Sequence, residues 1–340
     1  MVMHESLDSN MGWIGKLLNG GEAKNKSEPA PVIAAAPEIA PAPMPITEID
    51  ALYYRWLAGA GSTQAPAQAQ TEQQILDELA RLAREPLAGA ALVPRMPAII
   101  PQLMRTLQED NMNAAELSRQ LAQDVLLVAE VYREANRPRY HSRYNSSPSI
   151  SSMESAIMLL GQNNMRMLLA RVAFRPIVSM QSSGLTMRAA PQIWRQSEKC
   201  ALAASLVAPG LQANTFDAYL AGLIANVGLV VAFRLVDQLH APDAFPASDA
   251  FIAQVFAQAR MLSVRIAALW EFPDSVTHAI EQAAQAGAHQ QAQALALGER
   301  LSKLRMLADA GQFPADDSFV LAGLGEDALA AFDKLADDED

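Results

Sequence analysis

This sequence of 340 residues has few histidines and cysteines, two residue types that often bind metal ions or act as nucleophiles. Its five histidines stand apart, and no two have the spacing of a metal-binding motif such as H-x-x-H or H-E-x-x-H. The single cysteine, Cys200, lies in the alanine-rich run QSEKCALAASLVA, where a buried structural thiol is the usual occupant. Neither a G-x-S-x-G nucleophile motif nor a glycine-rich phosphate-binding loop is present. We therefore expect no metal centre, no cofactor and no nucleophilic active site.

The segment YREANRPRYHSRY, at residues 132–144, concentrates positive charge. Its candidate contacts to a ligand or partner are Arg133, Arg137, Arg139, Tyr140, His141, Arg143 and Tyr144. Arginine side chains beside aromatic rings can hold phosphates and stack on bases, so a nucleotide or single-stranded nucleic acid would fit. The simpler interpretation is a solvated connector, whose tyrosines pack on the core and whose arginines pair with acidic helices of residues 201–340. We favour the connector, because one such segment is a small electrostatic footprint on a chain with a formal net charge of −11.

Composition narrows the possible functions further. Hydrophobic residues make up 51% of the chain, enough for a well-buried core, and the pI near 5.0 argues against general binding to nucleic acids or anionic membranes. The longest apolar stretch, AYLAGLIANVGLVVAF at residues 218–233, has 16 residues, fewer than the ~17–25 that a membrane span needs. We therefore expect a buried core helix there. The sequence has no signal-peptide pattern, and it has only one cysteine. The predicted location is therefore the cytoplasm.

The first 46 residues have the composition of a disordered arm. Six prolines and six alanines fill 12 of the 17 positions from Pro29 to Pro45, which favours extended conformations over a packed core. Before this tether, two pairs of apolar residues at i, i+4 spacing form a candidate docking peptide, made of Trp13, Ile14, Leu17 and Leu18. Such a peptide can fold on a partner protein. The alternative is a frayed turn without function, because two glycines in so short a helix are unfavourable.

Helix signals recur beyond the arm, whereas no stretch alternates apolar and polar residues for long enough to predict a sheet. Residues 71–84 carry an apolar stripe at helical spacing, and Thr71 begins a capping-box pattern. Residues 294–308 carry another stripe, with Glu299 and Lys303 predicted as an exposed i, i+4 ion pair. The sequence therefore predicts an all-α fold of about a dozen helices.

A series of short motifs, in order and at matching spacing, resembles the HDOD domain family across about residues 90–285. The motifs are VPRMP at 93–97, QDVLL at 123–127, AN at 135–136, ISSMESAI at 150–157, LG at 160–161, WRQS at 194–197, AGLIANVG at 221–228 and WEFP at 270–273. Each motif alone is weak, but their ordered succession is specific.

The resemblance implies a multi-helix HDOD-like fold of two packed helical halves. We expect a disordered Pro/Ala-rich arm and tether at residues 1–46, a helical segment at 47–89, and an HDOD-like domain at 90–300. The domain would divide into a first half at about 90–185 and a degenerate HD-like half at 186–300. The expected end of the chain, residues 301–340, consists of C-terminal helices and an acidic tail.

HDOD domains are similar to the HD phosphohydrolases, in which a histidine and a later histidine–aspartate pair bind metal. The resemblance matches these ligand positions to Gln196, Ala225 and Asn226 of this chain. Alanine has no ligand atom, and an amide is neutral where a carboxylate would balance a divalent cation. The resemblance therefore implies a degenerate HD-type site without metal ligands, in a protein that is not an enzyme.

What remains is the role that the resemblance implies, a noncatalytic module of bacterial signal transduction that acts through protein–protein contacts. Its partners would be signalling proteins such as sensor kinases, response regulators or cyclic-di-GMP enzymes, and it would relay a state through helix packing. Two alternatives stay open: a residual metal-dependent phosphohydrolase, and nucleotide or nucleic-acid binding through residues 132–144. We expect no membrane span, and nucleic acid is the less favoured ligand.

Overall fold

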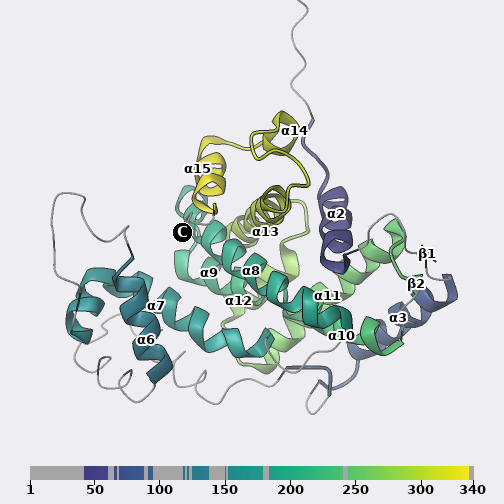
Figure 1. Cartoon of the computed structure of the whole chain (residues 1–340), viewed down its shortest axis with the longest axis horizontal. Helices are drawn as coiled ribbons and strands as arrows, with labels where there is room; N and C mark the ends of the chain where they lie inside the picture. Colours follow the sequence, from purple (N-terminus) through teal and green to yellow (C-terminus); the bar gives the residue numbers. More distant parts are fainter. Residues whose placement is uncertain are drawn as a thin grey trace, which may run out of the picture. The chain divides into compact units, whose positions relative to one another are not determined.

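The structure, a computed structural model, describes most of the chain from residue 42 onward. The described residues are 42–59, 65–66, 69–87, 91–94, 118, 121, 125–137, 150, 152–178, 184–239 and 244–336. Within them the regular structure is helical except for one pair of two-residue strands, which confirms the predicted all-α fold (Figure 1).

The α-helices are α2 (Ile46–Ala58), α3 (Ala69–Leu82), α6 (Val125–Ala135), α7 (Met153–Val178), α8 (Gly184–Val207), α9 (Thr215–Ile224), α10 (Val227–Leu239), α11 (Asp249–Leu269), α12 (Asp274–Gln282), α13 (Gln290–Asp309), α14 (Ser318–Leu321) and α15 (Glu326–Lys334). A 3-10 turn, η2 (Pro209–Leu211), follows α8. The strands β1 (Ala65–Pro66) and β2 (Ala244–Phe245) pair in parallel, with Ala65 opposite Ala244.

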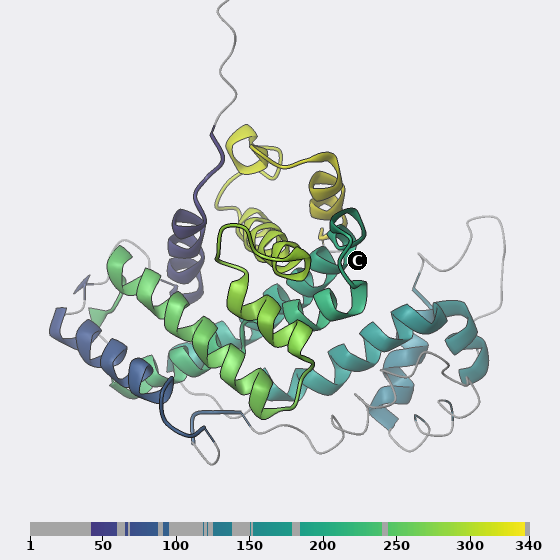
Figure 2. The same cartoon turned by 180° about the vertical axis from the view of Figure 1, so that it is seen from behind.

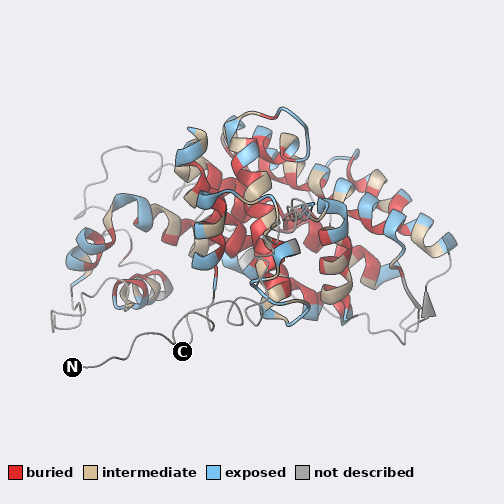
Figure 3. Cartoon of the chain, turned by 90° about the horizontal axis from the view of Figure 1, so that it is seen from above, coloured by how far each residue is buried: buried red, intermediate tan, exposed pale blue. Residues whose placement is uncertain are grey.

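Helix α8 is the centre of the packing and contacts α2, α7, α9, α10, α13 and α15. Its small buried residues, among them Ala201, let neighbouring helices approach closely. At the crossing with α9, a Cβ added to Gly222 would lie 2.6 Å from the Cα of Ala201, so only glycine fits there. Figure 3 shows that the buried residues concentrate on the central helices.

Helix α3, which precedes the region that resembles the HDOD family, is hydrogen-bonded to α11 and to the residue directly before α11. Glu72 of α3 accepts a hydrogen bond from the backbone N–H of Ser248 (3.0 Å), directly before α11. At the other end of α3, Arg265 of α11 donates to the carbonyl oxygens of Leu82 (2.9 Å) and Glu85 (2.6 Å). These contacts satisfy backbone groups that helix ends leave without partners, so α3 is an integral part of the assembly.

Helix α7 bends at Gly161, which has φ 71° and ψ 169°. This left-handed conformation favours glycine, because a side chain there would be strained. The start of α7 is capped by Ser152, whose Oγ accepts the N–H of Ser155 at 3.1 Å.

Two predicted helices are confirmed, and one cap is wrong. Helix α3 covers most of residues 71–84 and α13 covers all of 294–308. Thr71 does not cap α3, because the helix begins two residues earlier, at Ala69, and Thr71 lies within its first turn.

The apolar stretch at residues 218–233 forms two helices, α9 and α10, that meet at Ala225 and Asn226. By length and composition, the stretches Thr215–Leu239 and Asp249–Leu269 of the described chain could each cross a membrane. In the first, 94% of the most apolar window is buried inside the protein, as expected for core helices. The predicted burial of this stretch is confirmed, but the single helix is not.

The close approach of α10 to α11 can be tested at Gly228. A Cβ at this position would lie 2.0 Å from the carbonyl oxygen of Ala259, so Gly228→Ala must push two helices apart. We expect a loss of about 2–3 kcal/mol or more in the free energy of unfolding, measured by urea titration. Gly325→Ala is the matched control, because no atom lies within 4 Å of its added Cβ. A loss no larger than that of the control would contradict the tight packing.

Candidate functional site

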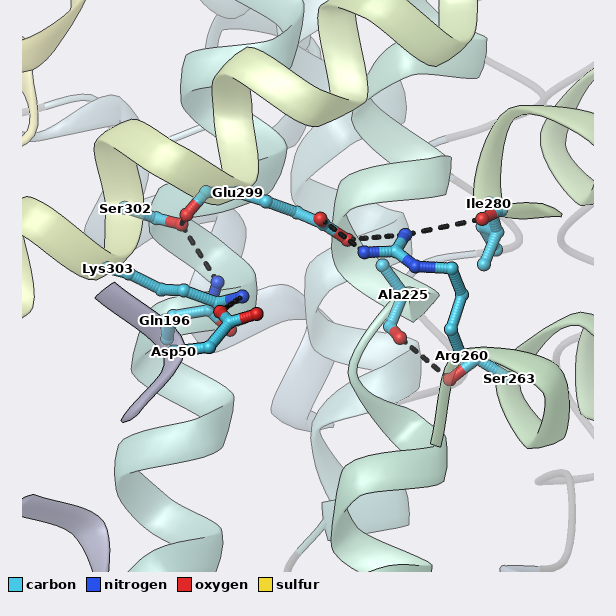
Figure 4. Close-up of polar contacts among 9 residues, drawn as sticks. All are labelled: Asp50, Gln196, Ala225, Arg260, Ser263, Ile280, Glu299, Ser302 and Lys303. Carbon is cyan, nitrogen blue, oxygen red and sulfur yellow. Dashed lines mark hydrogen bonds and ion pairs between the residues drawn. The ribbon is translucent and has the colours of Figure 1, made fainter. Parts of the chain in front are cut away.

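The three positions that the sequence matches to HD metal ligands are buried at the junction of several helices. Gln196 lies in α8 and has no exposed surface. Ala225 and Asn226 form the turn between α9 and α10, and both are buried. Helices α8, α9 and α10 therefore supply the positions, and α11 and α13 pack against them (Figure 4).

Gln196 bonds to the helix that faces it. Its Nε2 donates to Ser302 Oγ of α13 at 2.8 Å, and Ser302 Oγ donates in turn to the carbonyl oxygen of Glu299 at 3.1 Å. For Gln196 Oε1, no hydrogen-bond partner is found among the described residues. The side chain therefore links α8 to α13 through its amide nitrogen.

The turn between α9 and α10 is held by serine side chains. Ser263 of α11 donates from Oγ to the carbonyl oxygen of Ala225 at 2.7 Å and accepts the N–H of Gly228 at 2.9 Å. Asn226 donates from Nδ2 to Ser197 Oγ of α8 at 3.2 Å. The break in the apolar stretch is thus a corner in which Ser263 of α11 satisfies the backbone groups of Ala225 and Gly228.

These residues do not fit a divalent metal ion. Ala225 has no ligand atom, and the amide nitrogens of Gln196 and Asn226 donate to serine hydroxyls. Within the described part of the chain, no group of three or more His, Cys, Asp or Glu side chains is placed to hold a metal. The set of side chains carries no charge, whereas protein sites for divalent cations usually include carboxylates, which balance the charge of the ion.

A buried ion pair lies beside these positions. Arg260 of α11 binds Glu299 of α13 through two hydrogen bonds, of 3.0 and 2.7 Å, and also donates to the carbonyl oxygen of Ile280 at 3.2 Å. Burial alone would raise the pKa of the Glu299 carboxyl, but the charges of Arg260 and Lys303 and the Arg260 hydrogen bonds hold it below its ordinary value. Glu299 is therefore ionised within the core.

A second buried pair joins α13 to α2. Lys303 Nζ lies 2.6 Å from Asp50 Oδ1 and 4.7 Å from the centre of the Phe256 ring. The predicted exposed pair of Glu299 and Lys303 is therefore wrong. Both residues are buried, with 5% and 2% of their surface exposed, and each binds a partner from another helix. Their spacing does place them one helical turn apart. On that side of α13, however, side chains of α11 and α2 bind them.

Cys200 lies in the same region and is fully buried, as predicted. Its burial, reinforced by the charge of Glu299, raises the pKa of the thiol well above its ordinary range. The thiol therefore stays protonated at neutral pH. A protonated, inaccessible sulfur is a weak nucleophile, in agreement with a structural role.

The described part of the 132–144 segment pairs with acids of its own helix. Arg133 forms an ion pair with Glu130, and Arg137 Nε lies 3.4 Å from Glu134 Oε2. Glu134 also binds Arg171 of α7 at 3.0 Å. Among the described residues, the ion pairs found for Arg133 and Arg137 are thus with glutamates one helical turn away, whereas the sequence predicted partners in residues 201–340.

Several predicted contacts lie outside the described residues. They are Arg139, Tyr140, His141, Arg143 and Tyr144 of the cationic segment, and Trp13, Ile14, Leu17 and Leu18 of the candidate docking peptide. The residues that the sequence did not single out are Arg260, Asp50 and Ser263. Their partners are between 38 and 253 positions away along the chain, so no local pattern could reveal them.

The Arg260–Glu299 pair gives a test of the buried cluster. Glu299→Gln leaves the Arg260 charge without its carboxylate, and we expect a loss of about 3–5 kcal/mol in the free energy of unfolding at pH 7. Because the pKa of Glu299 is lowered in the folded state, its contribution is complete above the ordinary value of 4.5 and is lost as the pH falls below it. The variant should therefore lose less stability than the wild type on acidification.

The exposed pair of Arg55 and Asp249, with side chains 39% and 81% exposed, is the control. We expect Asp249→Asn to cost less than about 1 kcal/mol. Urea titrations between pH 7 and pH 3 measure both effects. Equal losses for the two variants at pH 7 would mean that burial of the Arg260–Glu299 pair has no energetic consequence.

The chain is similar to a known protein family in sequence and to solved structures in fold. The model of the HDOD domain family matches residues 93–286. No curated protein matches the chain. Among solved structures, a protein of Shewanella amazonensis SB2B, named provisionally as a metal-dependent phosphohydrolase, is 16% identical with a TM-score of 0.54, covering 78% of this chain and 98% of its own.

Another solved structure has the same fold. An HDOD domain protein of unknown function from Geobacter sulfurreducens is 19% identical with a TM-score of 0.51, and the match covers 79% of this chain and 94% of the other. At these identities the likeness concerns the fold alone. The family match, however, spans more than half of the chain and includes Gln196, Ala225 and Asn226. This chain therefore belongs to the HDOD domain family.

Proposed function

We propose that this chain is a noncatalytic regulatory module of bacterial signal transduction that works in the cytoplasm by binding partner proteins. The observation that carries the proposal is the state of the three degenerate ligand positions. Gln196 and Asn226 bond to serines of other helices, and the carbonyl oxygen of Ala225 is bound by Ser263. These three positions contribute to the packing of helices. We therefore infer that the module acts by binding other proteins.

Sensor kinases, response regulators and cyclic-di-GMP enzymes are the proposed classes of partner. A partner that prefers one packing of the helical halves over another shifts the equilibrium by its difference in affinity for the two states. Helix α7 supports such a relay. It bends at Gly161 and contacts α6 of the first half and α8 and α9 of the second, so it connects both halves.

A metal-dependent phosphohydrolase is the main alternative. The name of the Shewanella protein of the same fold favours it. The side chains at the site argue against a phosphohydrolase, because the described residues include no cluster of metal-binding side chains. Nucleotide binding by residues 132–144 is the other alternative, and the ion pairs of Arg133 and Arg137 with glutamates reduce the free positive charge available to a phosphate.

A phosphodiesterase assay separates the first two functions. We expect the purified chain, with added Mn²⁺ or Mg²⁺, to hydrolyse bis-p-nitrophenyl phosphate no faster than buffer does, because it lacks the ligands that would hold a catalytic ion. Turnover that disappears in the double variant Gln196→Ala/Asn226→Ala would contradict the proposal. Turnover that persists in this variant identifies a contaminating enzyme.

Partner capture tests the role of the arm. Crosslinking and pull-down from native cells would compare the full chain with a chain lacking residues 1–46. If Trp13, Ile14, Leu17 and Leu18 form a docking peptide, the shortened chain should lose at least one partner, and the quadruple alanine variant of these residues should lose the same one. Retention of every partner by both forms would exclude the docking peptide.

A further inference from the structure

We propose that Arg171 of α7 is a shared cation that couples α6 to α8, because it contacts Glu134 of α6 on one side and Glu198 of α8 on the other. A change of charge at one carboxylate then alters how Arg171 interacts with the other. As a location for the relay between the two halves, this inference rests on the proposed function. The coupling itself is a property of the chain alone, so it can be measured without a partner.

The two contacts of Arg171 are unequal. Its Nη2 donates to Glu134 Oε2 at 3.0 Å, whereas its Nε lies 3.8 Å from Glu198 Oε1. The first distance is that of a hydrogen bond, and the second is too long for one. Arg171 is therefore bound by Glu134 and attracted by Glu198 without a hydrogen bond.

The rigid shape of the guanidinium group makes these contacts depend on each other. Its N–H donors lie in one plane and have fixed directions. Because Nη2 is bound by Glu134, Nε can approach Glu198 only if the whole group shifts. Loss of the Glu134 charge permits that shift, and protonation of Glu198 leaves Arg171 to Glu134.

Arg137, at the end of α6, extends these contacts into a series of alternating charges. Its Nε lies 3.4 Å from Glu134 Oε2, the oxygen that also binds Arg171. The outer side chains of the series, Arg137 and Glu198, are 37% and 34% exposed, whereas Glu134 in the middle is 6% exposed. A charged side chain of a partner can therefore reach either end, and the covered middle transmits the effect.

Glu198 lies in surroundings that distinguish it from an exposed glutamate. Its burial raises the pKa of the carboxyl, and four neighbouring groups act in the opposite direction. These groups are the charges of Arg171, Arg175 and Arg137 and a hydrogen bond from Trp194. On α9, the titratable group that Glu198 influences is Tyr219, whose phenol stays protonated because burial raises its pKa. The titration of Glu198 can therefore be followed apart from that of exposed acids.

Apolar packing holds α7 in place around Arg171. Helix α6 packs along α7, and α7 packs on α8 and α9 (Figures 1 and 2). One turn beyond Arg171, the buried Phe174 lies against Trp270 and Phe272, with ring centres 6.4 and 5.4 Å apart. Substitutions at Arg171 and Glu134 should therefore change the charges and leave the helix in position.

The experiment is a double-mutant cycle that is read at Glu198. Carboxyl carbon-13 NMR of the full-length chain gives the acid dissociation constant of Glu198, which Glu134→Gln should raise. We expect this rise to be at least about threefold larger in the wild-type background than in the Arg171→Met background. The direct effect of removing the Glu134 charge is common to both backgrounds, so the difference reports the shift of Arg171.

Glu130→Gln is the matched control. Glu130 lies one turn before Glu134 in α6 and pairs with Arg133 and, at 3.8 Å, with Arg175. Its substitution should change the dissociation constant of Glu198 equally in both backgrounds, within about 1.5-fold. The coupling is disproved if Glu134→Gln has the same effect in both backgrounds, or if the effect of Glu130→Gln depends on Arg171 to the same extent.

A titration of the wild-type chain gives a second test, which holds even where a variant does not fold. Protonation of Glu198 should shift Arg171 toward Glu134. The Nε–H signal of Arg171 and the carboxyl carbon of Glu134 should therefore both change at the midpoint of the Glu198 titration. A Glu134 signal that does not respond at this midpoint would overturn the coupling. Because neither test includes a partner, such a result leaves the proposed binding of signalling proteins standing.

Discussion

Two buried cationic side chains constrain how helices α2, α11 and α13 pack together. Arg260 of α11 and Lys303 of α13 are withdrawn from water, and a buried charge without a partner costs several kcal/mol. Glu299 of α13 neutralises the first, and Asp50 of α2 neutralises the second. A shift of any of these helices by one turn, about 5.4 Å, would separate a pair. The arrangement of α2, α11 and α13 is therefore fixed by charge as well as by apolar contact.

The degenerate HD positions belong to the same assembly. Gln196 joins α8 to α13 through Ser302, and Ser263 joins α11 to the corner at Ala225. The resemblance to HD phosphohydrolases matches Gln196, Ala225 and Asn226 to metal ligands. In this chain, hydrogen bonds of neutral side chains and backbone groups join the helices at these positions.

The sequence predicted the fold class, the helices at residues 71–84 and 294–308, and the burial of the apolar stretch, because each depends on local periodicity. It failed where a distant residue decides the outcome. The i, i+4 spacing of Glu299 and Lys303 indicates an exposed pair, but their actual partners, Arg260 and Asp50, are 39 and 253 positions away. The corner at Ala225 was likewise missed, because the serine of α11 that stabilises it is 38 positions away.

Gln196, Ala225 and Asn226 are degenerate metal-ligand positions by resemblance, and the structure shows which hydrogen bonds they make. The most direct test is a calorimetric titration of the full-length chain with Mn²⁺. The account predicts no saturable binding that depends on Gln196 and Asn226, because their amide nitrogens donate to Ser302 and Ser197. One bound ion per chain, lost in the variant Gln196→Ala/Asn226→Ala, would contradict it.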